Sequence, residues 1–129
     1  MPAANRLRVM IVDDQLSMRA LVRQALSSFG IVDIRDEASG EAALATAKAD
    51  PPHLILSDLE MPGMDGFALL SAVRAEPALT KVPFIMLTGR VEREIVMKAA
   101  SLGATNYLGK PVKPAELKAK IEQTFGALS

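Results

Sequence analysis

The sequence contains no cysteine, no tryptophan and a single histidine, and these absences exclude several kinds of chemistry. Without cysteine the chain can form no disulfide, no thiolate metal site and no cysteine nucleophile. Because His53 is the only imidazole, a zinc site with two histidine ligands is excluded, and a histidine-based catalytic triad would have to use this residue. Basic and acidic residues number 15 each, so the formal net charge of zero argues against a general binder of polyanions such as DNA.

Long hydrophobic stretches are also absent. No apolar run reaches the roughly 18 residues that a membrane-spanning helix needs. Residues 1–6 contain no apolar block of the kind that a signal peptide carries. We therefore expect a soluble, cytoplasmic protein that does not enter a membrane. Half of the 129 residues are hydrophobic, which is enough for one domain with a sizeable core.

Strand-like apolar runs alternate with helical patterns five times along the chain. The runs typical of strands lie at residues 7–12, 31–36, 53–58, 82–87 and 105–108. The segments with apolar residues three and four apart, typical of helices, lie at 17–29, 39–49, 65–75, 90–102 and 114–125. This alternation predicts an α/β fold in which a single doubly wound sheet of five parallel strands is flanked by five helices. No linker is visible, so we expect one domain over residues 1–129, with its core at about 6–127 and no output domain.

The third strand-like run ends in one carboxylate, that of Asp58. The residues before it are mostly apolar, and the turn formers Pro62 and Gly63 follow shortly after it. This pattern is typical of a buried central strand. Ligands of open α/β sheets bind at the carboxyl ends of the strands. We therefore interpret Asp58 as a group held out for chemical modification, and His53, at the far end of the same strand, as structural.

Four of the predicted strands end in polar residues at one edge of the sheet. Asp13 and Asp14 follow the first strand, and Asp58 ends the third. Thr88 follows the fourth strand, and Lys110 lies just after the fifth. Because parallel strands bring these ends together, we expect three carboxylates, one hydroxyl and one ammonium in a single crevice. Each feature alone is common in turns and on surfaces, so the interpretation depends on their conjunction.

The predicted charges of this crevice indicate a metal ion and a phosphoryl group. Three carboxylates repel one another, and Lys110 offsets only one of their charges. Mg²⁺ prefers oxygen ligands and would offset the rest, with weak binding that a phosphate assists. Lys110 and Thr88 can then contact phosphoryl oxygens while one carboxylate acts as the nucleophile. Asp58 is best placed for that role, and Asp13 and Asp14 suit the metal.

The residues alone leave three other functions open. A flavin- or nucleotide-binding carrier of similar fold needs a Ser-, Thr- or Gly-rich phosphate loop after the first strand, where this chain has residues 13–16, Asp-Asp-Gln-Leu. A phosphatase with an aspartate nucleophile needs a second aspartate two residues further on, where this chain has Glu60. A docking protein that no longer switches would have no need of the complete set of acids.

These motifs resemble the receiver domain of two-component response regulators over essentially the whole chain. The similarity is greatest to the stand-alone, CheY-like chemotaxis regulators, and it implies a flavodoxin-like sheet with strand order 2-1-3-4-5. The matching residues are Ile11-Val12-Asp13-Asp14, Met18-Arg19, Asp58 with Met61-Pro62-Gly63-Met64-Asp65-Gly66, Leu87-Thr88-Gly89, Gly103-Ala104, and Tyr107 before Lys110-Pro111.

The resemblance implies a chemical role for the acidic residues. Asp58 would be the phosphoacceptor that receives phosphate from a histidine kinase. Asp13, Asp14 and Asp58, together with the backbone carbonyl of Glu60, would hold Mg²⁺. The protein would be a signalling phosphoacceptor and no enzyme in the ordinary sense, because it would catalyse only its own phosphorylation and slow dephosphorylation.

The resemblance also implies roles for the remaining motif residues. Thr88 and Lys110 would bind phosphoryl oxygens, and Gly89 would leave access to the phosphate. The Lys110–Pro111 peptide bond would be cis, a form that only bonds before proline adopt at small cost. On phosphorylation Thr88 would move toward the phosphoryl group and open a space into which Tyr107 can turn.

The readout surface would be formed by the fourth helix, the fifth strand and the last helix. The fourth helix carries an apolar stripe wider than one core-facing stripe needs, although a generous core contact explains it equally well. The stripe consists of Val91, Ile95, Ala99 and Leu102, with Val96 and Ala100 beside it. We expect a monomer that binds a histidine kinase and a downstream target protein in chemotaxis or motility signalling. The alternative is a phosphorelay or adaptor-type regulator of another pathway.

Two residues that flank the expected pocket depart from the chemotaxis pattern. Glu60 and Arg90 each lie two positions after a pocket residue, Asp58 and Thr88 respectively. The closest relatives are expected to have a polar amide and an acid at these positions. Our hypothesis is that Glu60 and Arg90 pair across the mouth of the pocket and tune dephosphorylation by restricting water.

Overall fold

Five parallel strands form the central sheet of the computed structural model, which describes residues 3–129. The strands are β1 (Arg8–Val12), β2 (Asp33–Glu37), β3 (Leu54–Asp58), β4 (Phe84–Thr88) and β5 (Asn106–Gly109). Their spatial order is β2-β1-β3-β4-β5, and every neighbouring pair is parallel. The predicted doubly wound sheet and its strand order are therefore confirmed.

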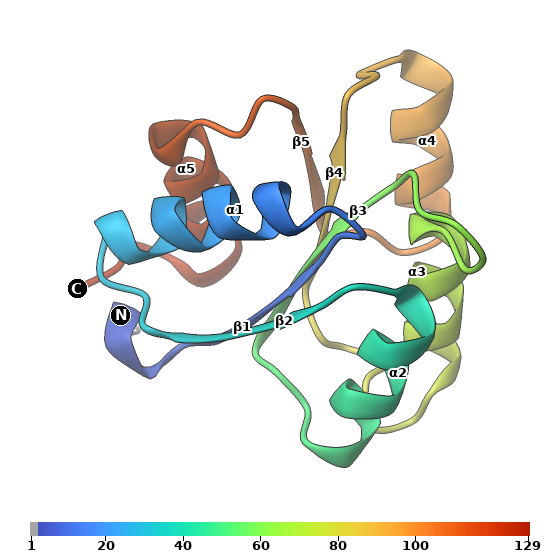
Figure 1. Cartoon of the computed structure of the whole chain (residues 1–129), viewed down its shortest axis with the longest axis horizontal. Helices are drawn as coiled ribbons and strands as arrows, with labels where there is room; N and C mark the ends of the chain where they lie inside the picture. The colour runs from blue at the N-terminus through green and yellow to red at the C-terminus, as the bar shows by residue number, and fades with distance from the viewer. Residues whose placement is uncertain (1–2) are drawn as a thin grey trace.

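Helices cover both faces of this sheet (Figure 1). They are α1 (Leu16–Ser28), α2 (Gly40–Ala49), α3 (Gly66–Ala75), α4 (Arg93–Ser101) and α5 (Pro114–Phe125), preceded by the short 3₁₀ helix η1 (Ala4–Arg6). Helices α1 and α5 lie against one face, and α2, α3 and α4 lie against the other. Within residues 3–129, no helix combines the length and the apolar character needed to cross a bilayer.

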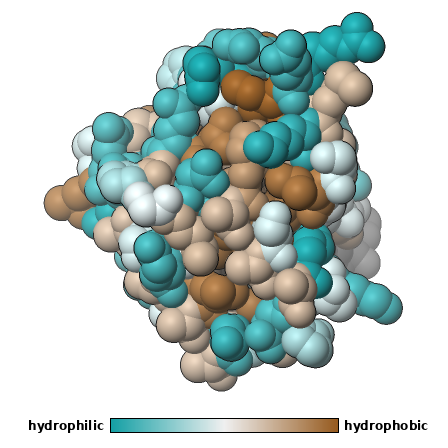
Figure 2. All heavy atoms as spheres, turned by 90° about the vertical axis from the view of Figure 1, so that its right-hand side faces the viewer, coloured by the Kyte–Doolittle hydropathy of each residue, from teal (hydrophilic) through white to brown (hydrophobic). Residues whose placement is uncertain are grey.

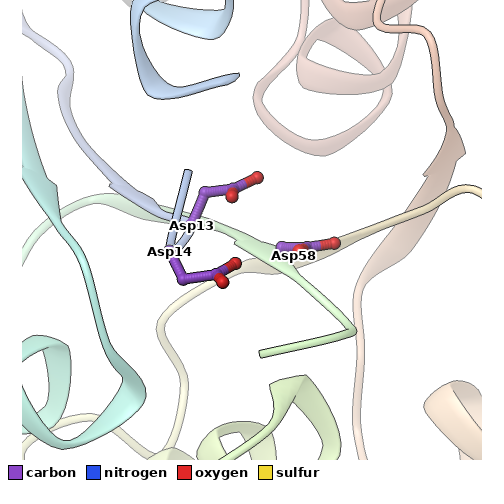
Figure 3. A group of neighbouring side chains, drawn as sticks. All are labelled: Asp13, Asp14 and Asp58. Carbon is purple, nitrogen blue, oxygen red and sulfur yellow. The ribbon is translucent and has the colours of Figure 1, made fainter. Parts of the chain in front are cut away.

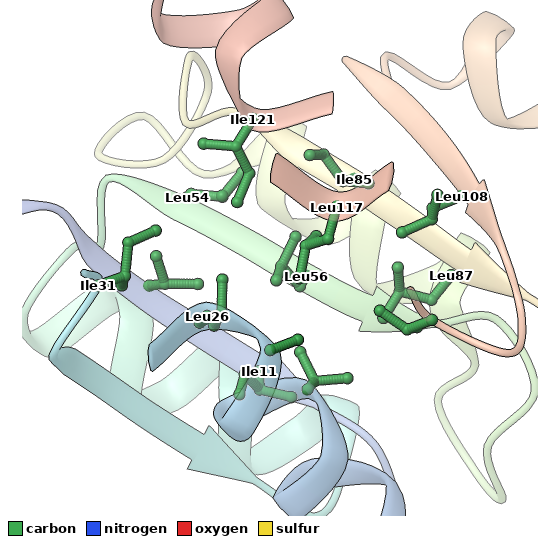
Figure 4. Close-up of a cluster of buried hydrophobic side chains, with 14 of the residues drawn as sticks. Ile11, Leu26, Ile31, Leu54, Leu56, Ile85, Leu87, Leu108, Leu117 and Ile121 are labelled. Atoms are coloured by element: carbon green, nitrogen blue, oxygen red, sulfur yellow. The ribbon is translucent and has the colours of Figure 1, made fainter. Parts of the chain in front are cut away.

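The sheet separates two hydrophobic cores, and alternate residues of each central strand enter different cores. In β1, Val9 and Ile11 join the core under α1 and α5, whereas Met10 and Val12 join the core under α2, α3 and α4. A strand with two buried faces needs apolar residues at every position, which explains the unbroken apolar runs. Figure 4 shows the first core, in which side chains of α1 and α5, Leu26 and Leu117 among them, meet the central strands.

Most predicted boundaries agree with the structure to within one or two residues, but the predicted helix at 90–102 is too long. Helix α4 begins at Arg93 and ends at Ser101. Val91 lies before the helix, close to the backbone of Gly109. A Cβ atom added to Gly109 would lie 2.8 Å from Cγ2 of Val91. The second strand also begins later than predicted, because the Ile31 N–H donates to the Leu26 carbonyl, 3.1 Å away, at the end of α1.

Candidate functional site

The carboxylates of Asp13, Asp14 and Asp58 meet at the carboxyl edge of the sheet (Figure 3). Each of them offers an oxygen that lies within 4.8 Å of an oxygen of the other two. Asp13 and Asp14 directly follow β1, and Asp58 ends the adjacent strand β3. Oxygen donors of this kind are what a hard divalent cation such as Mg²⁺ takes. The predicted acidic cluster is therefore present, and its donor set fits such an ion.

Lys110 bridges two of these carboxylates. Its Nζ lies 2.9 Å from Oδ1 of Asp58 and 3.3 Å from Oδ2 of Asp13. All three side chains are largely out of solvent, with Asp13 2% exposed, Asp58 8% and Lys110 19%. Charge pairs are screened little at such positions. One ammonium nevertheless leaves the cluster of three carboxylates with an excess of negative charge.

The ionisation of this pair is shaped by burial and by charge. Burial raises the pKa of Asp58 above its ordinary value, and the nearby Asp13 adds to the rise. Hydrogen bonding and attraction from Lys110, and a hydrogen bond from the Glu60 backbone, act in the opposite direction. Burial acts to lower the pKa of Lys110, but its contacts with Asp58 and Asp13 outweigh this and raise it. The two pKa values are thus shifted in the same direction, and in both cases the Lys110–Asp58 contact opposes the effect of burial.

The Thr88 hydroxyl is buried beside the acidic cluster, but its hydrogen bonds run to the loop between β4 and α4. It accepts from the Arg90 N–H at 3.0 Å and lies 3.3 Å from the Arg90 carbonyl, to which it can donate. The sequence predicted where this hydroxyl lies but not its partners. Because a hydroxyl has a single proton, donation to a phosphoryl oxygen would require it to give up the Arg90 carbonyl.

The mouth of the site is an open hollow of about 320 Å³. It is lined by Asp14, Gln15, Asp58, Glu60, Gly89 and Lys110. An added Cβ atom on Gly89 would meet no atom within 4 Å, so this side of the hollow is free. The Nε of Arg90 lies 3.2 Å from Oε1 of Glu60, and both side chains are 59% exposed. The predicted pairing of these two residues is therefore confirmed.

A glycine allows helix α3 to begin directly behind the end of β3. The Gly66 N–H donates to the Leu59 carbonyl at 2.8 Å. An added Cβ atom on Gly66 would lie 2.6 Å from the Asp58 carbonyl oxygen and 2.7 Å from Sδ of Met86. The preceding Asp65 caps the helix by accepting the Ala68 N–H at 2.9 Å. The motif after Asp58 thus fixes the backbone at this residue.

Arg19 is a site residue whose contacts sequence reasoning missed. Its Nη1 donates to the Asp13 carbonyl at 2.7 Å, and its Nε donates to Oδ2 of Asp36 at 3.2 Å. The Gln15 N–H also donates to Oδ1 of Asp13 at 2.9 Å. The sequence signal was the Met18-Arg19 pair in the matching motifs, but nothing in the sequence shows which backbone atom Arg19 reaches.

The predicted readout surface lies beside this edge of the sheet. Tyr107 is half-buried, and Nζ of Lys120 lies 4.9 Å from the centre of its ring. Within the predicted apolar stripe of α4 only Ala99 is buried, and Met97 beside it is 57% exposed. Figure 2 shows hydrophobic surface among hydrophilic side chains on the side of the molecule that carries α3 and α4.

The peptide bond between Lys110 and Pro111, directly after the lysine of the site, is cis, as predicted.

The fold and this site define a receiver domain, and the chain belongs to the response regulator receiver domain family, which matches residues 9–122. It is 43% identical over 128 residues to the probable chemotaxis protein CheY of Rhizobium etli, covering 99% of both chains. It is 34% identical over 122 residues to chemotaxis protein CheY-3 of Vibrio cholerae, covering 95% of this chain and 94% of the relative. The chain is therefore closely related to CheY chemotaxis regulators, which are signalling proteins.

Solved structures agree with this assignment. The chemotaxis response regulator CheY4 of Vibrio cholerae superimposes with a TM-score of 0.84 and 32% identity, covering 95% of this chain and 98% of that one. CheY in the CheX–CheY–BeF₃–Mg²⁺ complex of Borrelia burgdorferi superimposes with a TM-score of 0.86 and 26% identity, covering 92% and 89%.

Proposed function

We propose that this chain is a stand-alone response regulator that accepts a phosphoryl group from a histidine kinase on Asp58. The observation that carries the proposal is the contact of 2.9 Å between Lys110 Nζ and Asp58 Oδ1 inside a cluster of three carboxylates. This arrangement supplies a nucleophile, a fixed cation and an unsatisfied negative charge at one point. Its proposed cofactor is Mg²⁺, which accompanies BeF₃ in the structure of the Borrelia relative.

In the proposed reaction, an Asp58 carboxylate oxygen attacks phosphorus as the bond between phosphorus and the kinase histidine breaks. The imidazole leaves with the electron pair and takes a proton from water. Asp13, Asp14 and Asp58, with the Glu60 carbonyl, would hold Mg²⁺, which when bound neutralises charge on the acids and the phosphoryl group. Lys110 pairs with a phosphoryl oxygen, and water later attacks the acyl phosphate in slow dephosphorylation.

The proposed switch begins at Thr88. Its hydroxyl leaves the Arg90 backbone, to which it is bonded in this structure, and donates to a phosphoryl oxygen. The vacated space admits Tyr107, which lines a hollow of about 200 Å³ between α4 and β5. The surface of α4, β5 and α5 then binds the downstream target. A difference of only a few kcal/mol between two states allows one phosphoryl group to shift their populations.

The relatives named above support a role in chemotaxis or motility signalling, because both the Rhizobium and the Vibrio protein are chemotaxis proteins. We propose accordingly that the chain acts as a cytoplasmic monomer, without binding DNA directly. The exposed apolar side chains of α4, above all Met97, give a target protein apolar area to cover.

The test is phosphorylation by a small-molecule phosphodonor with Mg²⁺, followed by intact-protein mass spectrometry. Wild type should gain the mass of one phosphoryl group, and Asp58→Asn should gain none. Asp33→Asn is the matched control, because it removes a carboxylate from the opposite edge of the sheet, where Asp33 pairs with Arg8. Absence of label on wild type, or equal labelling of Asp58→Asn, rejects the proposal.

A further inference from the structure

Asp14 differs from the other two acids of the cluster because no residue in the described part of the chain holds its side chain. Asp13 and Asp58 both contact Lys110, whereas no residue within 3–129 makes a hydrogen bond or ion pair with the Asp14 carboxylate. Asp14 is also exposed. The place of this carboxylate therefore depends on the backbone that carries it, above all on the peptide group between Asp13 and Asp14.

Arg19 fixes that peptide group. Its Nη1 donates to the Asp13 carbonyl at 2.7 Å, while the Asp13 N–H donates to the Glu37 carbonyl at 3.2 Å. The second contact of Arg19, Nε to Oδ2 of Asp36 at 3.2 Å, ties it to the edge strand β2. The Arg19 side chain is only 15% exposed, so its guanidinium has little freedom to leave these partners. The backbone of the acid pair is thus anchored to β2 on both sides of Asp13.

We infer that Arg19 is a positioning residue for the metal-binding acids and that it acts through the Asp13 carbonyl. The inference rests on the proposed function, in which Asp13 and Asp14 hold Mg²⁺. A planar guanidinium places two donors at a fixed angle, one on the carbonyl and one on Asp36, and a lysine ammonium does not reproduce that fork. Mutation of a residue that orients metal ligands without touching the metal commonly lowers metal affinity by roughly 10- to 100-fold.

The charge of Arg19 and its geometry predict opposite effects. Arg19 is a cation close to the site of a second cation. If only its charge mattered, its removal would relieve repulsion and strengthen Mg²⁺ binding. If it positions the acids, its removal weakens Mg²⁺ binding, and replacement by lysine, which keeps the charge, weakens binding as well. The sign of the change therefore separates the two accounts.

The experiment is a titration of each protein with MgCl₂, followed by NMR through the backbone amides of residues 13–15. Arg19→Gln and Arg19→Lys should both bind Mg²⁺ roughly tenfold more weakly than wild type. Arg23→Gln is the matched control, since Arg23 Nη2 lies 3.5 Å from Oδ1 of the same Asp36 but makes no contact with Asp13. It should bind Mg²⁺ as wild type does. Melting temperatures in EDTA report separately on folding.

The outcomes distinguish this inference from the function on which it rests. Wild type that binds no Mg²⁺ overturns the proposed function and the inference with it. Wild-type affinity, or tighter binding, in both Arg19 variants overturns the inference alone. If the Arg19 variants unfold in EDTA, Asp36→Asn decides, because it loosens the anchor and leaves Arg19 in place. Its Mg²⁺ affinity should fall, and an unchanged affinity counts against the inference.

Discussion

At the scale of single residues, the site places more acid in a buried crevice than its one cation can balance. Asp13 and Asp58 are nearly buried, and removing ionised carboxylates from water is costly unless they are paired. Lys110 contacts both, but it offsets only one charge. In the function proposed above, the remaining imbalance would attract a divalent cation, and the cation-loaded site would then tolerate a phosphoryl group. The chemistry proposed for Asp58 thus follows from incomplete neutralisation.

The ion pair between Glu60 and Arg90 at the mouth of the pocket should influence how fast phosphate is lost. Glu60→Arg and Arg90→Glu should each speed the decay of phosphorylated protein about two- to fivefold, the range that an exposed ion pair worth ~0.5–1 kcal/mol allows. The double exchange restores an opposite-charge pair and should return the rate toward wild type. Decay of labelled protein after removal of the phosphodonor measures the rates. Strictly additive effects on the decay rate in the double variant would show that the Glu60–Arg90 pair does not control dephosphorylation.

At the scale of secondary-structure elements, the contact of α3 with the end of β3 depends on a single missing side chain. Gly66→Ala places a Cβ atom 2.6 Å from the Asp58 carbonyl oxygen and 2.8 Å from Cα of Leu59. Alanine favours helix by about 1 kcal/mol over glycine, but backbone atoms at these distances have to move. We expect a net loss of about 1–3 kcal/mol in the free energy of unfolding, measured by urea denaturation.

Gly89→Ala provides the control for this comparison. The same substitution there adds a Cβ atom with no neighbour within 4 Å, so the free energy of unfolding should stay close to that of wild type. Similar losses for the two variants would contradict the role given to close backbone approach at Gly66.

Helix α4 shows where sequence patterns stop being informative. The apolar spacing of residues 91, 95 and 99 continues a helical period, yet Val91 lies before the helix and packs on Gly109. The backbone at Glu92 is extended, with φ −106° and ψ 147°, so the helix begins after this residue despite the apolar spacing. Helix α5, whose first residue Pro114 is a strong local signal, has the predicted bounds. A strong local signal therefore predicted the start of α5, whereas apolar spacing alone placed the start of α4 too early.

The amino-terminal end of α4 lacks a side-chain cap. Glu92 occupies the capping position with no hydrogen bond from its side chain to the helix. Glu92→Asp keeps the charge and supplies a better capping residue, so it should stabilise this end by about 0.5–1 kcal/mol. Amide hydrogen exchange at Glu94 and Ile95 should slow up to about fivefold. Glu94→Asp, which makes the same change at a position inside the first turn, is the control and should not slow exchange at Ile95. Equal slowing at Ile95 in both variants would argue against capping.

At the scale of the whole molecule, the sequence predicted the fold and the meeting of the acids for the same reason. A parallel sheet aligns the ends of its strands, so residues 13, 58, 88 and 110 had to gather once five strand–helix repeats were recognised. The contacts within the site did not follow. The bond from Arg19 to the Asp13 carbonyl and that between Thr88 and Arg90 involve backbone atoms, which carry no residue-specific sequence signal.

The stability of the whole protein should depend on the charge of Asp58 when no metal is bound. Burial raises the pKa of Asp58 in the folded state above 3.8, its ordinary value, so the folded state binds this proton more tightly. The stability that this group contributes is fully present below the ordinary pKa and is lost as pH rises through the folded-state pKa. Asp58→Asn removes the ionisable group and with it this loss of stability at neutral pH. Lys110 is not left without a partner in the variant, because it still contacts Asp13.

In EDTA at pH 7, Asp58→Asn should therefore melt at a higher temperature than wild type, and the difference should shrink as pH falls toward 3.8. Adding Mg²⁺ should reverse the order, because an ion that binds only the folded state adds about 2.7 kcal/mol at a hundred times its Kd, and the variant lacks one of the ligands. Thermal melts of both proteins over this pH range, with and without Mg²⁺, measure both effects. Parallel profiles in EDTA would show that the buried charge of Asp58 has no cost in the folded state.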